Sequence, residues 1–269
     1  MALIKLEKLI LKQNICETVE NARELIISNR VLVNGALQNN VNAHFDISVQ
    51  ISLTKPPKKY VSRGGFKLEA ALVQFNIEVK NKKVLDVGTS TGGFTDCLLQ
   101  KGADHVISID VGRSQLDNKI RNHKDVTVFE RLNAKDLTLD ITNGPCDFCV
   151  IDVSFTSILP LLNAIFSVLT KDGEIIALIK PQFEGKKNQV DESGVIKEPE
   201  VHLEILKHFI EEFPDKYILE NLIYSPIKGA KGNIEFLAHF VPSYKNAPLG
   251  VDFSKIVYDA HNQLKGKDD

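Results

Sequence analysis

From residue 83 onward, short apolar segments alternate regularly with helical patterns. The apolar segments are KVLDVG, HVISID, VTVFE, FCVIDVSF and EIIALIK, and the helical patterns cover residues 93–101, 114–121, 156–169 and 199–211. Nearly continuous apolar runs are typical of central strands in a parallel sheet, because helices cover both of its faces. The alternation predicts an α/β fold with a doubly wound, mostly parallel sheet. YILENLIY and IEFLAHF then follow each other with only a loop between them, which predicts an antiparallel pair at one sheet edge.

The first part of the chain has a different pattern. Apolar residues recur at helical spacing over residues 3–13 and 18–28, and VLVNGALQ reads as a hairpin with an Asn-Gly turn. Residues 47–53 alternate as a further strand, and KPPKKY looks like a linker. Residues 1–67 hold 10 Lys and Arg against 5 Asp and Glu, whereas the rest of the chain is acidic. This asymmetry indicates a polyanion-binding first domain, with a chance surface imbalance as the alternative.

Composition excludes several classes of protein. The chain has 269 residues, of which 43% are hydrophobic and 25% charged, as in ordinary globular proteins. No apolar run is long enough to span a membrane, and charges interrupt MALIKLEKLILK before a signal peptide could form, so we expect a cytoplasmic protein. The one C-x-x-C motif, Cys146 to Cys149, lacks a second ligand pair and lies in an apolar run. We interpret it as structural and expect no metal site.

A glycine-rich turn follows the first strand of the alternating region, in KVLDVGTSTGGFTDCLL. Gly88 begins the turn, and Gly92 and Gly93 open the next helix, where backbone amides favour an anionic group. The spacing differs from the G-x-G-x-x-G of dinucleotide-binding folds, which disfavours a nicotinamide oxidoreductase. Asp86, two positions before Gly88, is a candidate for holding a cationic amino-acid group. The alternative is an ordinary strand–helix turn.

Three charged side chains end three other apolar strands. Asp110 ends HVISID, where a carboxylate can accept hydrogen bonds from ribose hydroxyls or cap the next helix. Asp152 and Lys180 end the fourth and fifth of these apolar strands, and ligands of open α/β sheets bind at this edge. A buried charge at a strand end requires a partner, so an Asp152–Lys180 ion pair is expected whether or not it is catalytic.

Seven segments together resemble a known family. VSRGGFKL, LDVGTSTGGFTD, SIDVG, VIDVSF, IKPQFE, GVIKEP and KGNIEFLAHF are similar, in this order, to the hemolysin A (TlyA) family. The resemblance implies a small α+β, S-four-type RNA-binding domain over residues 1–55 and a linker over 56–64. It further implies a Rossmann-like class I, FtsJ-like methyltransferase domain over 65–245 and a partly helical tail over 246–269. The implied cofactor is S-adenosylmethionine, and the implied reaction is 2′-O-methylation of ribosomal RNA, on cytidine of 16S or 23S rRNA.

The resemblance also assigns roles to individual residues. The implied catalytic tetrad is Lys67, Asp152, Lys180 and Glu235, with Lys180 activating the ribose hydroxyl. The implied cofactor-binding positions are Asp86, Gly88, Ser90, Gly92, Gly93, Phe94, Asp110, Asn133 and Asp152. The implied RNA-binding positions are Lys5, Arg23, Arg30 and Arg63. The family's Arg-Leu-Asp run corresponds here to Lys5-Leu6-Glu7.

Other functions stay open at this point. An RNA-binding protein with an inactive methyltransferase domain would share the fold, and a base-modifying methyltransferase would share the cofactor. DVSF lacks the proline of many base-modifying enzymes, which favours ribose. A pore-forming haemolysin would need an export signal and an insertion segment, and the sequence shows neither. Lys228 and Lys231, in the loop before the last strand, are candidates for RNA phosphates or a solvated pair.

Overall fold

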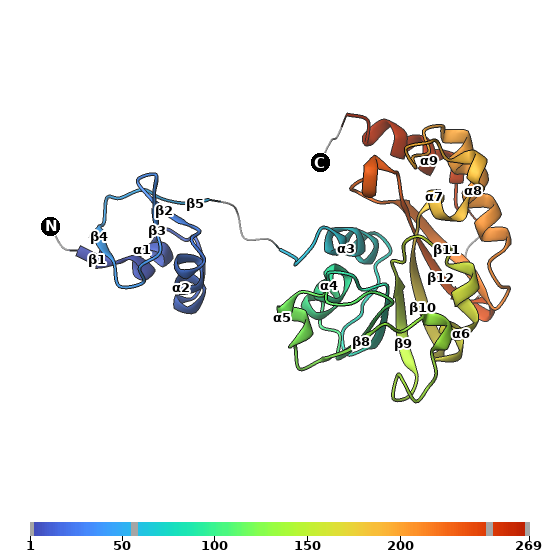
Figure 1. The fold of residues 1–269 in the computed structure, drawn as a ribbon, viewed down its shortest axis with the longest axis horizontal. Helices are drawn as coiled ribbons and strands as arrows, with labels where there is room; N and C mark the ends of the chain where they lie inside the picture. The colour runs from blue at the N-terminus through green and yellow to red at the C-terminus, as the bar shows by residue number, and fades with distance from the viewer. Residues whose placement is uncertain (1–2, 55–58, 246–249, 267–269) are drawn as a thin grey trace. The chain divides into compact units, whose positions relative to one another are not determined.

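The computed structural model describes residues 3–54, 59–245 and 250–266. The chain divides into two compact units, Met1–Lys59 and Tyr60–Asp269 (Figure 1). Each unit has its own hydrophobic core.

The first unit packs two helices against short strands. Its helices are α1 (Leu6–Lys12) and α2 (Val19–Ile27), and its strands are β1 (Leu3–Lys5), β2 (Val31–Val33), β3 (Ala36–Gln38), β4 (His44–Asp46) and β5 (Ile51–Leu53). β1 pairs with β4, and a second sheet has the order β3-β2-β5. Asn34 and Gly35 both adopt positive φ, 50° and 80°, as a tight hairpin turn requires. The expected helix from residue 3 is wrong at its start, because residues 3–5 hydrogen-bond to β4 instead.

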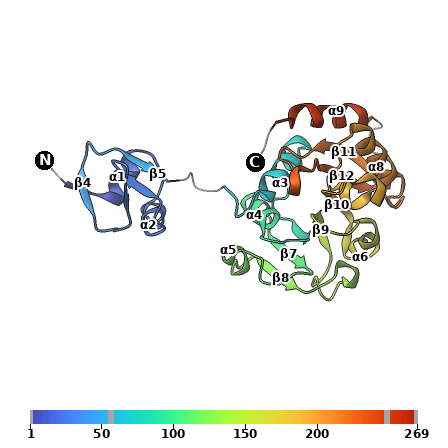
Figure 2. The ribbon, with the colours of Figure 1, turned by 45° about the horizontal axis from the view of Figure 1, so that its top comes forward.

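A seven-stranded sheet forms the centre of the second unit (Figure 2). Its strands are β6 (Lys83–Val87), β7 (His105–Asp110), β8 (Val126–Glu130), β9 (Cys146–Ile151), β10 (Leu169–Ile179), β11 (Tyr217–Tyr224) and β12 (Phe236–Pro242). They lie in the order β11-β12-β10-β9-β6-β7-β8. β12 runs antiparallel to β10 and β11, whereas the pairs from β10 to β8 are parallel. The predicted doubly wound sheet with an antiparallel edge is confirmed.

Helices cover both faces of this sheet. They are α3 (Gly64–Gln74), α4 (Gly93–Gln100), α5 (Asn118–Arg121), α6 (Leu162–Ser167), α7 (Pro181–Glu184), α8 (Pro199–Glu211) and α9 (Phe253–Gln263). α3 and α4 contribute to the core on one face, and α6, α8 and α9 to the core on the other. Cys146 and Cys149 are buried in β9, where burial raises the pKa of the Cys146 thiol to about 11, in keeping with a structural role.

The boundary between the units differs from the expected linker of residues 56–64. Residues 56–58 lie outside the described residues, but Tyr60 is buried and its ring fills the space where Gly65 lacks a side chain. The backbone amide of Val61 donates to Asp96 Oδ2 at 2.8 Å. Residues 60–64 therefore belong to the second unit. Sequence periodicity also missed α3, because Gly64 and Gly65 at its start weaken the helical pattern.

The chain's last described segment, 250–266, is also part of the second unit. Val257 and Ala260 on α9 are fully buried against α8 and β11. None of the helices in the described part of the chain is long and apolar enough to cross a membrane.

Candidate active site

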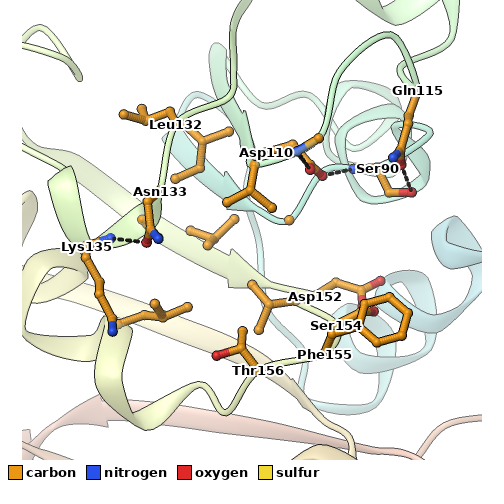
Figure 3. Close-up of a pocket in the computed structure, with 18 residues that line it drawn as sticks. Ser90, Asp110, Gln115, Leu132, Asn133, Lys135, Asp152, Ser154, Phe155 and Thr156 are labelled. Carbon is orange, nitrogen blue, oxygen red and sulfur yellow. Dashed lines mark hydrogen bonds between the residues drawn. The ribbon is translucent and has the colours of Figure 1, made fainter.

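A cavity of about 510 Å³ lies at the carboxyl edge of the parallel strands (Figure 3). We call it the Asp110 cavity. It is lined by the loops that follow β6, β7, β8 and β9, which is where ligands bind in open α/β sheets. Asp110, Asn133 and Asp152 reach it from three different loops, and Ile109, Val111, Leu132 and Leu161 supply apolar surface.

Backbone amides hold Asp110 in place. Its Oδ2 accepts a hydrogen bond from the amide of Ser90 at 2.7 Å, and its Oδ1 accepts one from Gly112 at 2.6 Å. Ser90 adopts a left-handed φ of 51°, so the glycine-rich turn points its amide at the carboxylate. Asn133 Oδ1 accepts from the amide of Lys135 at 3.0 Å. A carboxylate offers about four acceptor sites, so Asp110 keeps capacity for a ligand.

A second cavity of about 290 Å³ adjoins the first, since Gly88, Ser90 and Asp152 line both. We call it the Lys67 cavity. It is lined by Lys67 on α3, by Arg63 just before this helix, and by Gly93 and Phe94 on α4. Gly229 and Ala230 close it from the loop before β12.

The glycines of the turn are required by close packing within the protein. Gly88 has φ 86°, and a Cβ there would lie 2.5 Å from the carbonyl oxygen of Asp152. A Cβ on Gly92 would lie 2.8 Å from Leu116, and one on Gly93 would overlap Ser62 at the start of α3. The missing side chains therefore let three segments converge beside the Lys67 cavity.

Two lysine–carboxylate pairs stand at the wall of this second cavity. Lys180 Nζ, at the end of β10, lies 2.6 Å from Asp152 Oδ1 and donates to Ser154 Oγ at 2.7 Å. Lys67 Nζ lies 2.5 Å from Glu235 Oε2, across 168 residues of sequence. Lys67 and Asp152 line the cavity, and Glu235 and Lys180 are their respective ion-pair partners. The four residues of the implied tetrad are thus brought together as two pairs.

Asp86 lies apart from both cavities. Its side chain is fully buried and points at α4, where Thr95 Oγ1 donates to Oδ2 at 2.5 Å. Its Oδ1 finds no hydrogen-bond partner among the described residues. Burial raises the pKa of Asp86 to about 7, and the charges of Asp152 and Asp110 add to the rise, while the Thr95 bond opposes it. Asp86 lines neither cavity and its carboxylate faces α4, so its role in holding a cationic amino-acid group, directly or through water, stays a prediction.

The candidate RNA-binding residues fall in both units. Arg23 pairs with Glu7, Nε to Oε2 at 2.6 Å, which lowers the pKa of Glu7 and raises that of Arg23. Lys5 ends β1, and the carbonyl of Arg30 accepts from the amide of Thr54. In the second unit, Arg63 donates to the carbonyl of Lys228 at 3.3 Å.

The remaining lysine of the loop before β12 is also engaged. Lys231 Nζ donates to the carbonyl of Ser193 at 2.7 Å, so this loop is tied to residues 191–196. This bond uses one of the three donors of an exposed amine, so the phosphate contact and the solvated pair both stay open for Lys231.

Sequence reasoning missed the residues that follow Asp152. Ser154 holds Lys180, and Phe155 lines the Asp110 cavity with its side chain 91% exposed and φ at 65°. The sequence predicts a strand that ends at Asp152, and β9 ends one residue earlier, at Ile151. The polar Ser154, two residues after the carboxylate of Asp152, is the signal that could have indicated a loop.

The fold and the site define a class of protein, a Rossmann-like methyltransferase. The chain belongs to the FtsJ-like methyltransferase family, whose sequence model matches residues 60–241, and its relatives are of the hemolysin A (TlyA) type. The resemblance carried by the seven segments is thereby confirmed. Among the described residues, no cluster of three or more His, Cys, Asp or Glu could hold a metal ion.

Three comparisons illustrate the relationship. Hemolysin A of Brachyspira hyodysenteriae is 40% identical over 88% of this chain and 100% of its own length. The 16S/23S rRNA (cytidine-2′-O)-methyltransferase TlyA of Mycobacterium tuberculosis is 34% identical over 84% of this chain and 85% of its own. A solved structure from Streptococcus thermophilus, provisionally named a hemolysin, is 34% identical with a TM-score of 0.72, covering 98% of both chains.

Proposed function

We propose that this protein is an S-adenosylmethionine-dependent methyltransferase that methylates a cytidine ribose 2′-hydroxyl of ribosomal RNA in the cytoplasm. The observation that carries the proposal is the pair of lysine–carboxylate contacts, Lys180–Asp152 and Lys67–Glu235, at one cavity wall. TlyA of M. tuberculosis, named as a 16S/23S rRNA (cytidine-2′-O)-methyltransferase, supports the choice of substrate.

The carboxylates of Asp110 and Asp152, which line the Asp110 cavity, suit a cationic cofactor. Their charges also contribute to the raised pKa of the buried Asp86. A ligand with positive charge relieves this repulsion. Asp110 would hold the ribose of the cofactor, Asn133 and the apolar residues its adenine, and the Lys67 cavity its amino-acid part. When bound, S-adenosylmethionine supplies an electrophilic methyl group on a sulfonium.

The protein's own residues can prepare the 2′-hydroxyl. Lys180 would take up its proton or stabilise the alkoxide as it forms, and both roles need the amine fixed in direction. Asp152 and Ser154 fix it, because they hold the amine at 2.6 and 2.7 Å. Lys67, held by Glu235, would position the ribose. Alignment of hydroxyl and methyl donor supplies much of the rate.

Both units would contribute to RNA binding. Phe155 is an exposed aromatic ring beside the Asp110 cavity, and unstacked RNA bases are commonly held on such rings. We assign the first unit as an S-four-type RNA-binding domain because the resemblance to the hemolysin A (TlyA) family implies one, and its positive charge is consistent with RNA binding. Lys5 and Arg30 would contact phosphates, and Arg23 would do so while paired with Glu7.

Methyl mapping tests the proposal. Ribosomal RNA from cells with and without the protein is mapped for 2′-O-methyl groups, and purified protein is assayed with labelled cofactor on both ribosomal subunits. We expect a 2′-O-methyl cytidine that depends on the protein and is lost with Asp152→Asn. Labelled methyl on a base would replace this function with base modification. RNA binding without transfer would indicate an inactive methyltransferase domain.

A further inference from the structure

The loop of residues 152–158, which we call the β9 loop, is tied down at two points. The first tether is Lys180, which contacts both Asp152 and Ser154 near the beginning of the loop. The second tether is Glu184, which lies four residues after Lys180 at the end of α7. Between the two tethers lies Phe155.

Glu184 holds the far end of the β9 loop with both of its carboxylate oxygens. Oε1 accepts a hydrogen bond from the amide of Ile158 at 2.9 Å, and Oε2 accepts one from Ser157 Oγ at 2.5 Å. Ser157 Oγ in turn accepts from the amide of Leu159 at 3.2 Å, at the start of the next helical turn. Burial raises the pKa of Glu184 although both hydrogen bonds oppose the rise. Burial therefore disfavours the charge of Glu184, although each of its carboxylate oxygens accepts a hydrogen bond from the β9 loop.

Phe155 has a conformation that its own contacts do not explain. A left-handed φ of 65° is unfavourable for a bulky residue, and the side chain remains 91% exposed. Its ring lies 5.3 Å from that of Phe183, the residue before Glu184, at a tilt of 47°. Strained conformations persist where the surroundings over-determine them. The two tethers provide that constraint, and Phe183 and Glu184 on one short helix support the ring and the loop together.

We propose that Glu184 is a positioning residue for the RNA substrate, which holds the β9 loop so that Phe155 is presented to a base of the target RNA. Glu184 acts through the loop and does not itself touch the cofactor or the reacting atoms. The inference rests on the proposed function and deepens it, since it assigns control of substrate binding to a residue outside both cavities.

Steady-state kinetics with ribosomal RNA tests this role. Glu184→Ala is expected to raise KM for RNA about tenfold, the effect of roughly one hydrogen bond, with a smaller change in kcat. Affinity for S-adenosylmethionine, measured by calorimetry, should stay within twofold. In Glu184→Gln, the side-chain oxygen can still accept from the amide of Ile158, and the side-chain nitrogen can donate to Ser157 Oγ. The KM of this variant should therefore stay near the wild-type value. Glu204→Ala removes an exposed glutamate from the neighbouring helix α8 and serves as the matched control.

A double-mutant cycle separates positioning from general structural support. If Glu184 acts through Phe155, Glu184→Ala should have little further effect on KM in a Phe155→Ala background. Additive effects of the two substitutions would overturn the proposal, as would a wild-type KM for the folded Glu184→Ala variant.

A fluorescence measurement tests the loop without relying on activity. The chain contains no tryptophan, so Phe155→Trp introduces a single reporter. Adding Glu184→Ala should lower the anisotropy of this tryptophan, whereas adding Glu204→Ala should not. Unchanged anisotropy would overturn the role of Glu184 even if methylation is observed. If methyl transfer is absent in the wild type but the anisotropy falls as expected, the proposed function fails while the tether itself stands.

Discussion

Asp86→Asn is expected to stabilise the protein, and to do so only above acidic pH. Asp86 is fully buried, one of its oxygens has no partner in the described structure, and burial raises its pKa from 3.8 to about 7. The folded state therefore favours the protonated acid, whereas the unfolded chain ionises at an ordinary pKa. Asparagine mimics the protonated form in size and can still accept the hydrogen bond from Thr95.

The size and sign of the effect follow from this pKa difference. Because the folded pKa is the higher one, the protonated acid gives full stability below about pH 4, and this stability is lost as the pH rises through 7. A difference of about 3 pKa units corresponds to roughly 4 kcal/mol at 1.36 kcal/mol per unit. Asparagine does not ionise, so the variant loses no stability at this position over the same pH range. Its advantage over wild type should be near zero at pH 4 and greatest at pH 8.

Thermal unfolding of the cofactor-free protein between pH 4 and pH 8 measures this advantage. At 2–4 °C per kcal/mol, the expected gain in Tm at pH 8 is on the order of 10 °C. Asp104→Asn, at an exposed position, is the matched control and should shift Tm little at any pH. A gain that is equal at all pH values, or a variant less stable than wild type at pH 8, would refute the reasoning about Asp86.

Substitutions at three further residues test other parts of the structure. Lys180→Ala should lower single-turnover methylation at least about 10²-fold while the cofactor still binds, and residual activity in Lys180→Arg would favour alkoxide stabilisation over proton abstraction. Wild-type turnover in a folded Lys180→Ala protein would exclude the catalytic role. Asp110→Ala should weaken binding of S-adenosylmethionine by about 1.5–3 kcal/mol, and calorimetric titration with equal affinities would remove Asp110 from the site. Burial lowers the pKa of His202 to about 4, with the charge of His261 adding to the shift. Since the unfolded chain takes up the proton first, stability should fall by up to about 3 kcal/mol between pH 6.5 and pH 4, and His202→Gln should remove this part of the pH dependence in urea unfolding.

The sequence predicted the sheet and the strand-end charges because both depend on local pattern. Apolar runs of strand length identified β6 to β10, and the carboxyl ends of parallel strands meet at one edge. Asp110 and Asp152 are therefore found beside one cavity, and Lys180 pairs with Asp152 as the burial argument required. These expectations needed no knowledge of which distant segments meet.

Features that depend on distant contacts could not be derived in this way. Lys67 and Glu235 are 168 residues apart, and only the resemblance to a family placed them together. Asp86 was expected at the ligand, but its side chain faces Thr95 on α4. Phe155 follows an apolar run, and its left-handed φ occurs in a loop whose two ends contact Lys180 and Glu184.

Stability does not explain the two lysine–carboxylate pairs. Lys67 and Glu235 are both buried. Replacing a buried ion pair with apolar side chains of the same volume often leaves a protein equally stable, or makes it more stable by about 1–4 kcal/mol. Loss of one partner alone costs about 3–5 kcal/mol, because the other charge stays buried without compensation. The pair therefore introduces a vulnerability that an apolar core would avoid. Since Lys67 and Asp152 both line the cavity beside the glycine-rich turn, we infer that the proposed methyl transfer at that wall accounts for the charges there.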